Sequence, residues 1–286
     1  MSAAMLGIIG GTGLYRIEGL EITDSRNVDT PFGKPSAAVT IGTLEGRKVA
    51  FLPRHGLHHA LLPGEINYRA NIWAFKSVGV RKLVGVSAVG SLRKEIEPGQ
   101  LALPHQYFDW TGGKRAKSFF GDGLAAHIST AEPVCASLSK QIIAAAEAAK
   151  IPLHAKTTYA CVEGPRLGTR AESFFLKNAG CDLVGMTNVP EAFLAREAQL
   201  CYCTIAIATD YDCWLEDPSQ HVTVDKVMEL HQKNLGRVKG ILKQLVMGEP
   251  TGATDCSCRH SLDGAVLTAE QGLSDDRRKI LAFLKE

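Results

Sequence analysis

Short apolar runs alternate with helical patterns along most of the chain. Six runs have the length and composition of buried strands, and glycine, proline or polar residues bound each of them. These runs are residues 6–10, 48–53, 82–90, 101–105, 181–189 and 203–208. Because strands that alternate with helices are typical of α/β proteins, the pattern predicts an α/β fold with a mostly parallel central sheet.

Six further segments carry apolar residues at helical spacing. They are residues 67–79, 134–150, 170–180, 191–199, 222–248 and 275–286. The loop-like stretch between the last two, residues 248–264, is neither long nor polar enough to separate two domains. We therefore expect a single domain, residues 1–248, with a C-terminal extension, residues 249–286, packed on it.

Composition and charge narrow the class of protein. The chain has 286 residues, of which 45% are hydrophobic, enough for one large core. Its 32 basic and 30 acidic residues are interspersed and the formal net charge is +2, which argues against nucleic acid or a membrane as partner. The sequence shows neither a cleavable leader nor an apolar run of about 20 residues, so we expect a soluble, cytoplasmic protein.

The eight cysteines do not follow the paired spacing of a zinc site, and we expect no metal. Most of them stand in apolar runs, where a buried and inert thiol is the simplest interpretation. Cys256 and Cys258 differ, because they lie in a polar tail.

Three strand ends carry groups that suit an oxyanion. The sequence GGTG at residues 10–13 offers backbone amides and the Thr12 hydroxyl, or else forms only a tight turn. Arg54 and His55 follow the next strand, either as anion donors or as part of a solvated loop. Ser87 ends the third strand, at the edge where open α/β sheets bind ligands. Together these groups fit one phosphate or sulfate.

Two aspartates follow the last apolar run. Asp210 and Asp212 share one side of an extended segment, where a turn with a helix-capping Asp is the simpler interpretation. The alternative is a site for a base, because a carboxylate accepts from an exocyclic amine and a protonated carboxyl donates to a ring nitrogen. Met186, at another strand end, either packs on a sugar or fills the core, and Glu191 is expected to serve the first turn of the next helix.

Several motifs then occur in a recognisable order. They are IIGGTGL, VDTPFGKPS, RHG, NYRANIWA, GSLR, AEP, EGPR, RAESF, MTNVPEA and TDYDCW. Together they resemble the 5′-methylthioadenosine phosphorylases, a branch of the trimeric class of the purine nucleoside phosphorylase family, over residues 5–245. The resemblance implies a single α/β domain with a central mixed β-sheet flanked by helices. It also implies a homo-oligomer, either a trimer or a dimer of trimers, with sites near the subunit interfaces.

The implied reaction is phosphorolysis of 5′-methylthioadenosine to adenine and 5-methylthioribose 1-phosphate, by a pentosyltransferase of purine and methionine salvage. Inorganic phosphate is a co-substrate, and no cofactor is implied. Residues 1–248 would form the phosphorylase domain. Phosphate would attack C1′ of the ribose while Asp210 relieves the negative charge that develops on the departing adenine.

The family's site residues carry over onto positions of this chain. The implied phosphate-binding residues are Thr12, Arg54, His55, Ser87, Ala88 and Thr187. The implied ribose- and base-binding residues are Met186, Leu167, Gly168, Asn188, Asp210 and Asp212, the last two being catalytic. The implied pocket for the 5′ substituent holds His127, Val224, Val227 and Met228, with His127 reaching a neighbouring subunit's site.

The chain departs from the family pattern at three positions. Leu167 and Gly168 stand where this branch commonly has Phe and Ser, and where the 6-oxopurine branch has Phe and Glu. Without that Glu, the site lacks a partner for a protonated N1, which favours a 6-aminopurine. Leu167 offers the base no aromatic edge, and Asn188 is a further candidate contact that would broaden specificity.

The tail pair Cys256 and Cys258 resembles the CXC pair of some hexameric members, in which it forms a disulfide. Two cysteines one residue apart close a strained ring, so such a bond would be easily reduced. Two unpaired thiols are the alternative.

Other functions stay open. Within the family, the alternative is a purine nucleoside phosphorylase acting on adenosine, inosine, guanosine or methylthioinosine. A non-catalytic nucleoside-binding protein is disfavoured by the retained Thr12, Arg54, His55 and aspartate pair. A dinucleotide-binding oxidoreductase is disfavoured because GGTG lacks the spaced glycines of the dinucleotide fingerprint.

Overall fold

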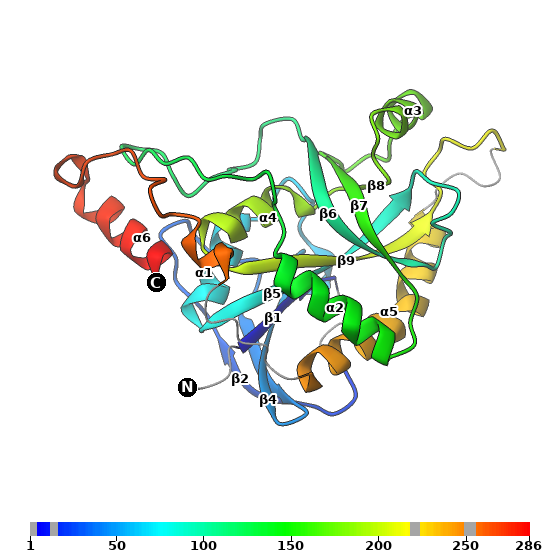
Figure 1. Ribbon diagram of the computed structural model, residues 1–286, viewed down its shortest axis with the longest axis horizontal. Coiled ribbons are helices and arrows are strands. Elements are labelled where there is room, and N and C mark those ends of the chain that lie inside the picture. Colours follow the sequence, from blue (N-terminus) through cyan, green and yellow to red (C-terminus); the bar gives the residue numbers. More distant parts are fainter. Residues whose placement is uncertain (1–4, 12–16, 218–223, 249–255) are drawn as a thin grey trace.

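The computed structural model describes residues 5–11, 17–217, 224–248 and 256–286 (Figure 1). Thr12 therefore lies outside the described residues, as do the side chains of Val224 and Val227. A mixed sheet forms the centre of the molecule. Its strands are β1 (Met5–Gly10), β2 (Leu20–Arg26), β3 (Val39–Leu44), β4 (Arg47–Pro53), β5 (Val80–Ser91), β6 (Leu101–Trp110), β7 (Leu153–Val162), β8 (Leu183–Gly185) and β9 (Cys201–Asp210).

The sheet has the strand order β2-β3-β4-β1-β5-β8-β7-β6-β9. Strand β9 pairs with β5 as well as with β6, so β5, β8, β7, β6 and β9 close into a ring. Five strand pairs are parallel, namely β1–β4, β1–β5, β5–β9, β6–β7 and β7–β8. Four pairs are antiparallel, namely β2–β3, β3–β4, β5–β8 and β6–β9. The mixed sheet that the family resemblance implied is confirmed, and the mostly parallel sheet expected from the pattern alone was too simple.

All six predicted helices are present. They are α1 (Tyr68–Ser77), α2 (Ala136–Ala148), α3 (Arg170–Asn178), α4 (Asn188–Glu197), α5 (Val224–Met247) and α6 (Asp275–Lys285). Local capping accounts for several of the boundaries. The Asn67 side chain accepts from the backbone N–H of Ala70 at the start of α1, and Gly79, with φ of 93°, follows its end. Thr169 and Glu172 form a reciprocal capping box at the start of α3.

Helices cover both faces of the sheet because the central strands are apolar on both sides. Along β1, Ile8 packs in a cluster with residues of α2 and α5, whereas Ile9 packs in a second cluster with residues of α1 and α4. Successive residues of a strand point to opposite faces, so a strand with both faces covered reads as one continuous apolar run. This explains why the central strands could be recognised from the sequence.

The observed strands differ from the predicted ones in two ways. Strands β2, β3 and β7 were not predicted, and six of the seven residues of β2 are exposed, so that it offers no apolar run. The run predicted over residues 181–189 shrinks to β8, because α4 already begins at Asn188.

The C-terminal extension packs against α1. Leu262 and Leu284 belong to the same apolar cluster as Phe75 of α1. The buried ammonium of Lys76 donates to the carbonyls of Ala198 and Leu284, 2.8 Å away in each case. The last helix is therefore fixed by both apolar and polar contacts.

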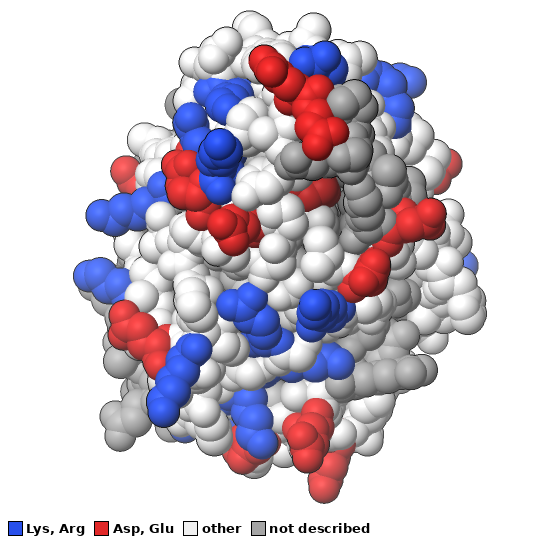
Figure 2. Space-filling model, turned by 90° about the vertical axis from the view of Figure 1, so that its right-hand side faces the viewer, with Lys and Arg blue, Asp and Glu red and all other residues white. Residues whose placement is uncertain are grey.

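Basic and acidic side chains both occur across the face of the molecule shown in Figure 2. Among the described residues, no helix is both long enough and apolar enough to cross a bilayer.

Gly7 offers a test of the packing between β1 and α1. A Cβ at Gly7 would lie 2.8 Å from Val80 Cγ1 and 3.0 Å from Phe75 Cδ1, so Gly7→Ala should lower the free energy of unfolding by about 1–3 kcal/mol. Gly236 of α5 has no atom within 4 Å of its Cβ position, so Gly236→Ala should raise the same free energy by up to about 1 kcal/mol. Chemical denaturation checks both variants, and a Gly7→Ala variant as stable as the wild type would contradict this packing.

Candidate functional site

Three neighbouring strands end together at one edge of the sheet. Gly10 at the end of β1 is paired with Pro53 at the end of β4, and Ile9 is paired with Gly85 of β5. The backbone N–H of Arg54 donates to the Gly10 carbonyl over 2.9 Å. The residues that follow β1 and β4 therefore reach the same edge as the second half of β5, as predicted.

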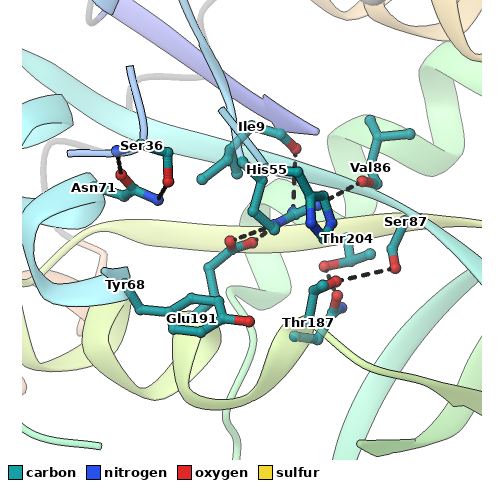
Figure 3. Close-up of polar contacts among 12 residues, drawn as sticks. Ile9, Ser36, His55, Tyr68, Asn71, Val86, Ser87, Thr187, Glu191 and Thr204 are labelled. Carbon is teal, nitrogen blue, oxygen red and sulfur yellow. Dashed lines mark hydrogen bonds and ion pairs between the residues drawn. The ribbon is translucent and has the colours of Figure 1, made fainter. Parts of the chain in front are cut away.

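A buried ion pair lies directly beneath this edge. The Arg54 guanidinium, which is 1% exposed, donates to both carboxylate oxygens of Glu191 in α4, over 2.6 and 2.8 Å (Figure 3). It also donates to the carbonyls of Val86, over 2.9 Å, and Ile9, over 3.2 Å. The Tyr202 hydroxyl donates to Glu191 over 2.7 Å. The guanidinium thus joins β1, β4, β5 and α4 at one point.

This geometry corrects two expectations. Arg54 is not part of a solvated loop, and four of its five N–H groups are used inside the protein, which leaves one at Nη1 for an anion. Glu191 does lie in the first turn of α4, but its carboxylate serves Arg54 rather than the helix end. Sequence analysis missed this pairing because the partners are far apart in the chain.

His55 is held as a neutral imidazole. Burial lowers the pKa of the His55 ring to about 4, so the ring is uncharged at neutral pH. Its Nδ1 lies 2.8 Å from the Leu61 carbonyl, which can only accept, so the proton is on Nδ1 and Nε2 is left as an acceptor. The ring stacks on His59 with 4.2 Å between centroids. His55 can therefore receive a hydrogen bond from a protonated oxyanion.

A group of hydroxyls lies beside these residues. The Ser87 hydroxyl is 3.3 Å from that of Thr187 (Figure 3). It is also 3.4 Å from the hydroxyl of Tyr159. Ser87 and Thr187 come from β5 and from the turn before α4, and Ala88, next along β5, is half-buried. The structure brings Ser87 and Thr187 together as predicted. Tyr159, on the unpredicted strand β7, was not foreseen.

The aspartate pair closes the other end of the site. The Asp210 carboxylate accepts from the Thr209 hydroxyl and from the Asp212 backbone N–H, both over 2.7 Å. Burial raises the pKa of the Asp210 carboxyl from 3.8 to about 6, and burial also raises the pKa of Asp212. Gly90 of β5 leaves room for the pair, because a Cβ there would lie 3.0 Å from Asp210 Oδ1. Asp210 is thus an acid that can hold a proton near neutral pH.

The two ends are separated along β5. Asp210 pairs with Gly90 in β5, three residues beyond Ser87, so their backbones are separated by about 10 Å along the strand. Asp212 lines a cavity of about 230 Å³ together with Gly168. A Cβ at Gly168 would lie 3.9 Å from Asp212 Oδ2, so the missing side chain leaves the acid accessible there.

The other predicted residues fall into two groups. Met186 lies close to Gly164, which lines the same cavity as Asp212. The buried Arg115 guanidinium donates to the Met186 carbonyl over 2.7 Å and so positions the backbone of Met186. Sequence analysis did not single out this arginine. Asn188 is fully buried, and its amide donates to Thr204 over 2.6 Å. Its Oδ1 is buried without a hydrogen-bond partner among the described residues, and contact of Asn188 with substrate stays a prediction.

The remaining predicted residues are Leu167, His127, Val224, Val227 and Met228, and their contact with substrate stays a prediction. Leu167 is 39% exposed and Met228 is 46% exposed. His127 is also exposed, and its backbone N–H donates to the Ala265 carbonyl of the extension. Val224 begins α5, but its side chain is outside the described residues.

The arrangement defines a class of protein. It is an α/β protein with a cluster of hydroxyl and imidazole groups and a pair of buried acids at the ends of adjacent strands. A family model described as the phosphorylase superfamily matches residues 5–246. The chain belongs to this superfamily.

Relatives and solved structures agree with this membership. The S-methyl-5′-thioadenosine phosphorylase of Geobacter sulfurreducens is 46% identical over 280 residues, which cover 98% of this chain and 97% of the relative. The protein of the same name from Nitrosopumilus maritimus is 47% identical over 260 residues, or 91% of this chain and 97% of the relative. The family resemblance carried by the sequence motifs is confirmed.

The crystal structure of a methylthioadenosine phosphorylase from an antarctic soil metagenomic library has a TM-score of 0.92, with 41% identity and 99% of both chains covered. The methylthioadenosine phosphorylase of Schistosoma mansoni in complex with adenine has a TM-score of 0.82, with 38% identity over 85% of this chain and 91% of that one. The fold like that of the purine nucleoside phosphorylases is therefore also confirmed.

The buried ion pair can be tested by removing one partner. Arg54→Ala leaves the Glu191 carboxylate buried without its cation, so the free energy of unfolding should fall by about 3–5 kcal/mol. The double variant Arg54→Met/Glu191→Leu removes both charges and should lose less than the single variant. Urea denaturation measures both, and an Arg54→Ala variant as stable as the wild type would show that the pair does not hold the strand ends.

Proposed function

We propose that this chain catalyses the phosphorolysis of 5′-methylthioadenosine to adenine and 5-methylthioribose 1-phosphate. The observation that carries the proposal is the spacing of the buried acid Asp210 from the hydroxyl and imidazole groups at Ser87 and His55, which matches a nucleoside lying along β5. The names of the relatives that cover nearly the whole chain support the same reaction.

Each end of the site has a defined part in this reaction. Phosphate attacks C1′ of the ribose, a C1′–O bond forms and the C1′–N9 bond breaks, and its electron pair passes to the adenine. Asp210, whose pKa of about 6 lets it carry a proton, donates that proton to N7, and Asp212 accepts from the exocyclic amine. Positioning of the two reactants supplies up to about 7–11 kcal/mol of the barrier reduction. No cofactor or metal takes part in these steps.

The proposed binding residues follow from the same pose. Phosphate is held by the hydroxyls of Thr12, Ser87 and Thr187, by His55 and by the one N–H that Arg54 has left. Backbone atoms at Ala88 lie beside it. The ribose lies against Met186, and the base lies against Leu167, Gly168, Asp210 and Asp212.

The 5′ substituent is assigned to His127 of a neighbouring subunit and to the first turn of α5, with Val224, Val227 and Met228. This assignment makes the active protein a homo-oligomer, a trimer or a dimer of trimers, built from a phosphorylase domain of residues 1–248 with its extension. The cytoplasm is the proposed location, where the eight free thiols would stay reduced.

Selection of the 5′ group should be modest. An apolar pocket rejects an added hydroxyl by only about 10²-fold, so adenosine should be a slower substrate than 5′-methylthioadenosine by roughly that factor in kcat/KM. Inosine and guanosine, the substrates of the alternative purine nucleoside phosphorylase, should react more slowly still, because Gly168 provides no acceptor for a protonated N1. A panel of these nucleosides, each with and without phosphate, measures the order, and a preference for inosine would support the alternative.

Asp210→Asn tests the role of the acid. The Asn carbonyl can still accept from Asp212 N–H, and Thr209 can turn its hydroxyl toward the Val89 carbonyl, 3.2 Å away, while accepting from the Asn amide. The fold should persist, yet kcat for 5′-methylthioadenosine should fall by about 10²–10⁴ because the acid is lost. Steady-state kinetics measures this, with Asp24→Asn on the exposed strand β2 as the control.

The free energy of unfolding of Asp210→Asn shows whether a fall in kcat comes from a loss of stability. The folded pKa of Asp210 lies above its unfolded value of 3.8, so its stabilising contribution is present below that value and is lost as pH rises through about 6. Asp210→Asn should therefore be at least as stable as the wild type at pH 7. A stable variant with normal kcat would remove Asp210 from the acid role.

A further inference from the structure

Four cysteines converge at the end of β9 remote from the candidate site. Cys201 is the first residue of β9, Cys135 is the N-cap of α2, and Cys256 and Cys258 stand at the start of the described tail. Their four sulfurs all lie within 4.8 Å of one another. The Cys256 sulfur is 3.5 Å from that of Cys135 and 3.6 Å from that of Cys201.

These separations match a tetrahedral metal–thiolate centre. Zn–S bonds of about 2.3 Å place the sulfurs of a tetrahedral site about 3.8 Å apart. A set of four thiolates selects zinc over hard cations such as magnesium or calcium. Three of the four cysteines are buried, and Cys256 is half-buried, so the cluster is shielded but still has a path to solvent.

The surroundings favour the thiolate form. The backbone N–H of Leu138 donates to the Cys135 sulfur over 3.3 Å at the N-terminus of α2, where the helix dipole favours negative charge. The Arg196 guanidinium donates to the Cys258 sulfur over 3.2 Å. Zn²⁺ with four thiolates carries a net charge of −2, and these two groups compensate part of it.

A disulfide explains the cluster less well. All eight cysteines are free thiols in the structure, and the CXC disulfide that the family resemblance implies stays a prediction that the mass spectrometry below tests. Two disulfides would draw the four sulfurs into two pairs, whereas Cys256 lies almost equally far from Cys135 and from Cys201. Cys203, two residues along β9 from Cys201, stands outside the cluster and contacts the Ser139 hydroxyl instead, over 3.2 Å.

We propose that Cys135, Cys201, Cys256 and Cys258 bind one Zn²⁺ that fastens the C-terminal extension to the central sheet. Binding releases the proton of each thiol, and the folded extension gains the binding energy of the metal. The nine steps along β9 from Cys201 to Asp210 span about 30 Å, so the metal is structural and takes no part in the reaction proposed above.

The test begins with the metal content of the whole protein. Protein produced without a metal-affinity tag and purified without chelator should contain one zinc per chain by elemental analysis. The double variant Cys256→Ser/Cys258→Ser should lose it, whereas Cys203→Ser, a buried cysteine of β9 outside the cluster, should keep it. Loss of zinc should lower Tm, while kcat at low temperature should change by less than twofold.

A measurement on the wild type guards against a variant that fails to fold. Zinc is removed under reducing conditions and Co²⁺ alone is added, which should give the intense visible absorption of tetrahedral cobalt thiolate at one equivalent per chain. Three results would overturn the proposal. They are wild-type protein that holds no zinc and gives no such absorption, zinc retained in full by the double variant, and a disulfide among the four cysteines in freshly isolated protein by mass spectrometry.

Discussion

The buried ion pair between Arg54 and Glu191 is the interaction on which the rest of the site depends. The guanidinium follows β4, the carboxylate belongs to α4, and the remaining bonds reach the carbonyls of Ile9 in β1 and Val86 in β5. A fully buried charge is stable only when it is paired and its hydrogen bonds are satisfied. This requirement forces three strands and one helix into a single arrangement, and that arrangement places Ser87 beside Thr187.

Strand β9 carries a different kind of group at each of its two ends. At its carboxyl end, burial raises the pKa of Asp210 to about 6, so this carboxyl can hold a proton near neutral pH. At its amino end, Cys201 meets three other cysteines and joins the sheet to the tail. One strand therefore carries a buried acid at one end and the cysteine cluster at the other, with a continuous buried sequence between them.

Sequence reasoning succeeded where a local pattern reports a physical constraint. The apolar runs of β1, β5 and β9 are visible because both faces of these strands are buried, and the residues at their ends could be placed at one edge from strand direction alone. Sequence reasoning failed where the constraint joins residues that are far apart in the chain. Glu191 looked like an ordinary first-turn acid, because nothing nearby in the sequence indicates its pairing with Arg54.

Two further misses have the same cause. Tyr159 lies on β7, whose first half is polar and partly exposed and so did not read as a strand. The cysteine cluster escaped notice because its members come from three distant segments and only Cys256 and Cys258 are close in sequence. The bond between the Asn188 amide and Thr204 of β9 was equally invisible, because it joins two separate elements.

The central claim is that one pocket binds an oxyanion beside Ser87 and His55 and a 6-aminopurine beside Asp210 and Asp212. A crystal structure of the protein with adenine and phosphate tests this claim most directly. The account predicts the adenine N7 within hydrogen-bond distance of the Asp210 carboxyl and the phosphate within hydrogen-bond distance of the Ser87 hydroxyl. Adenine bound away from the aspartates, or phosphate bound away from this strand edge, would contradict it.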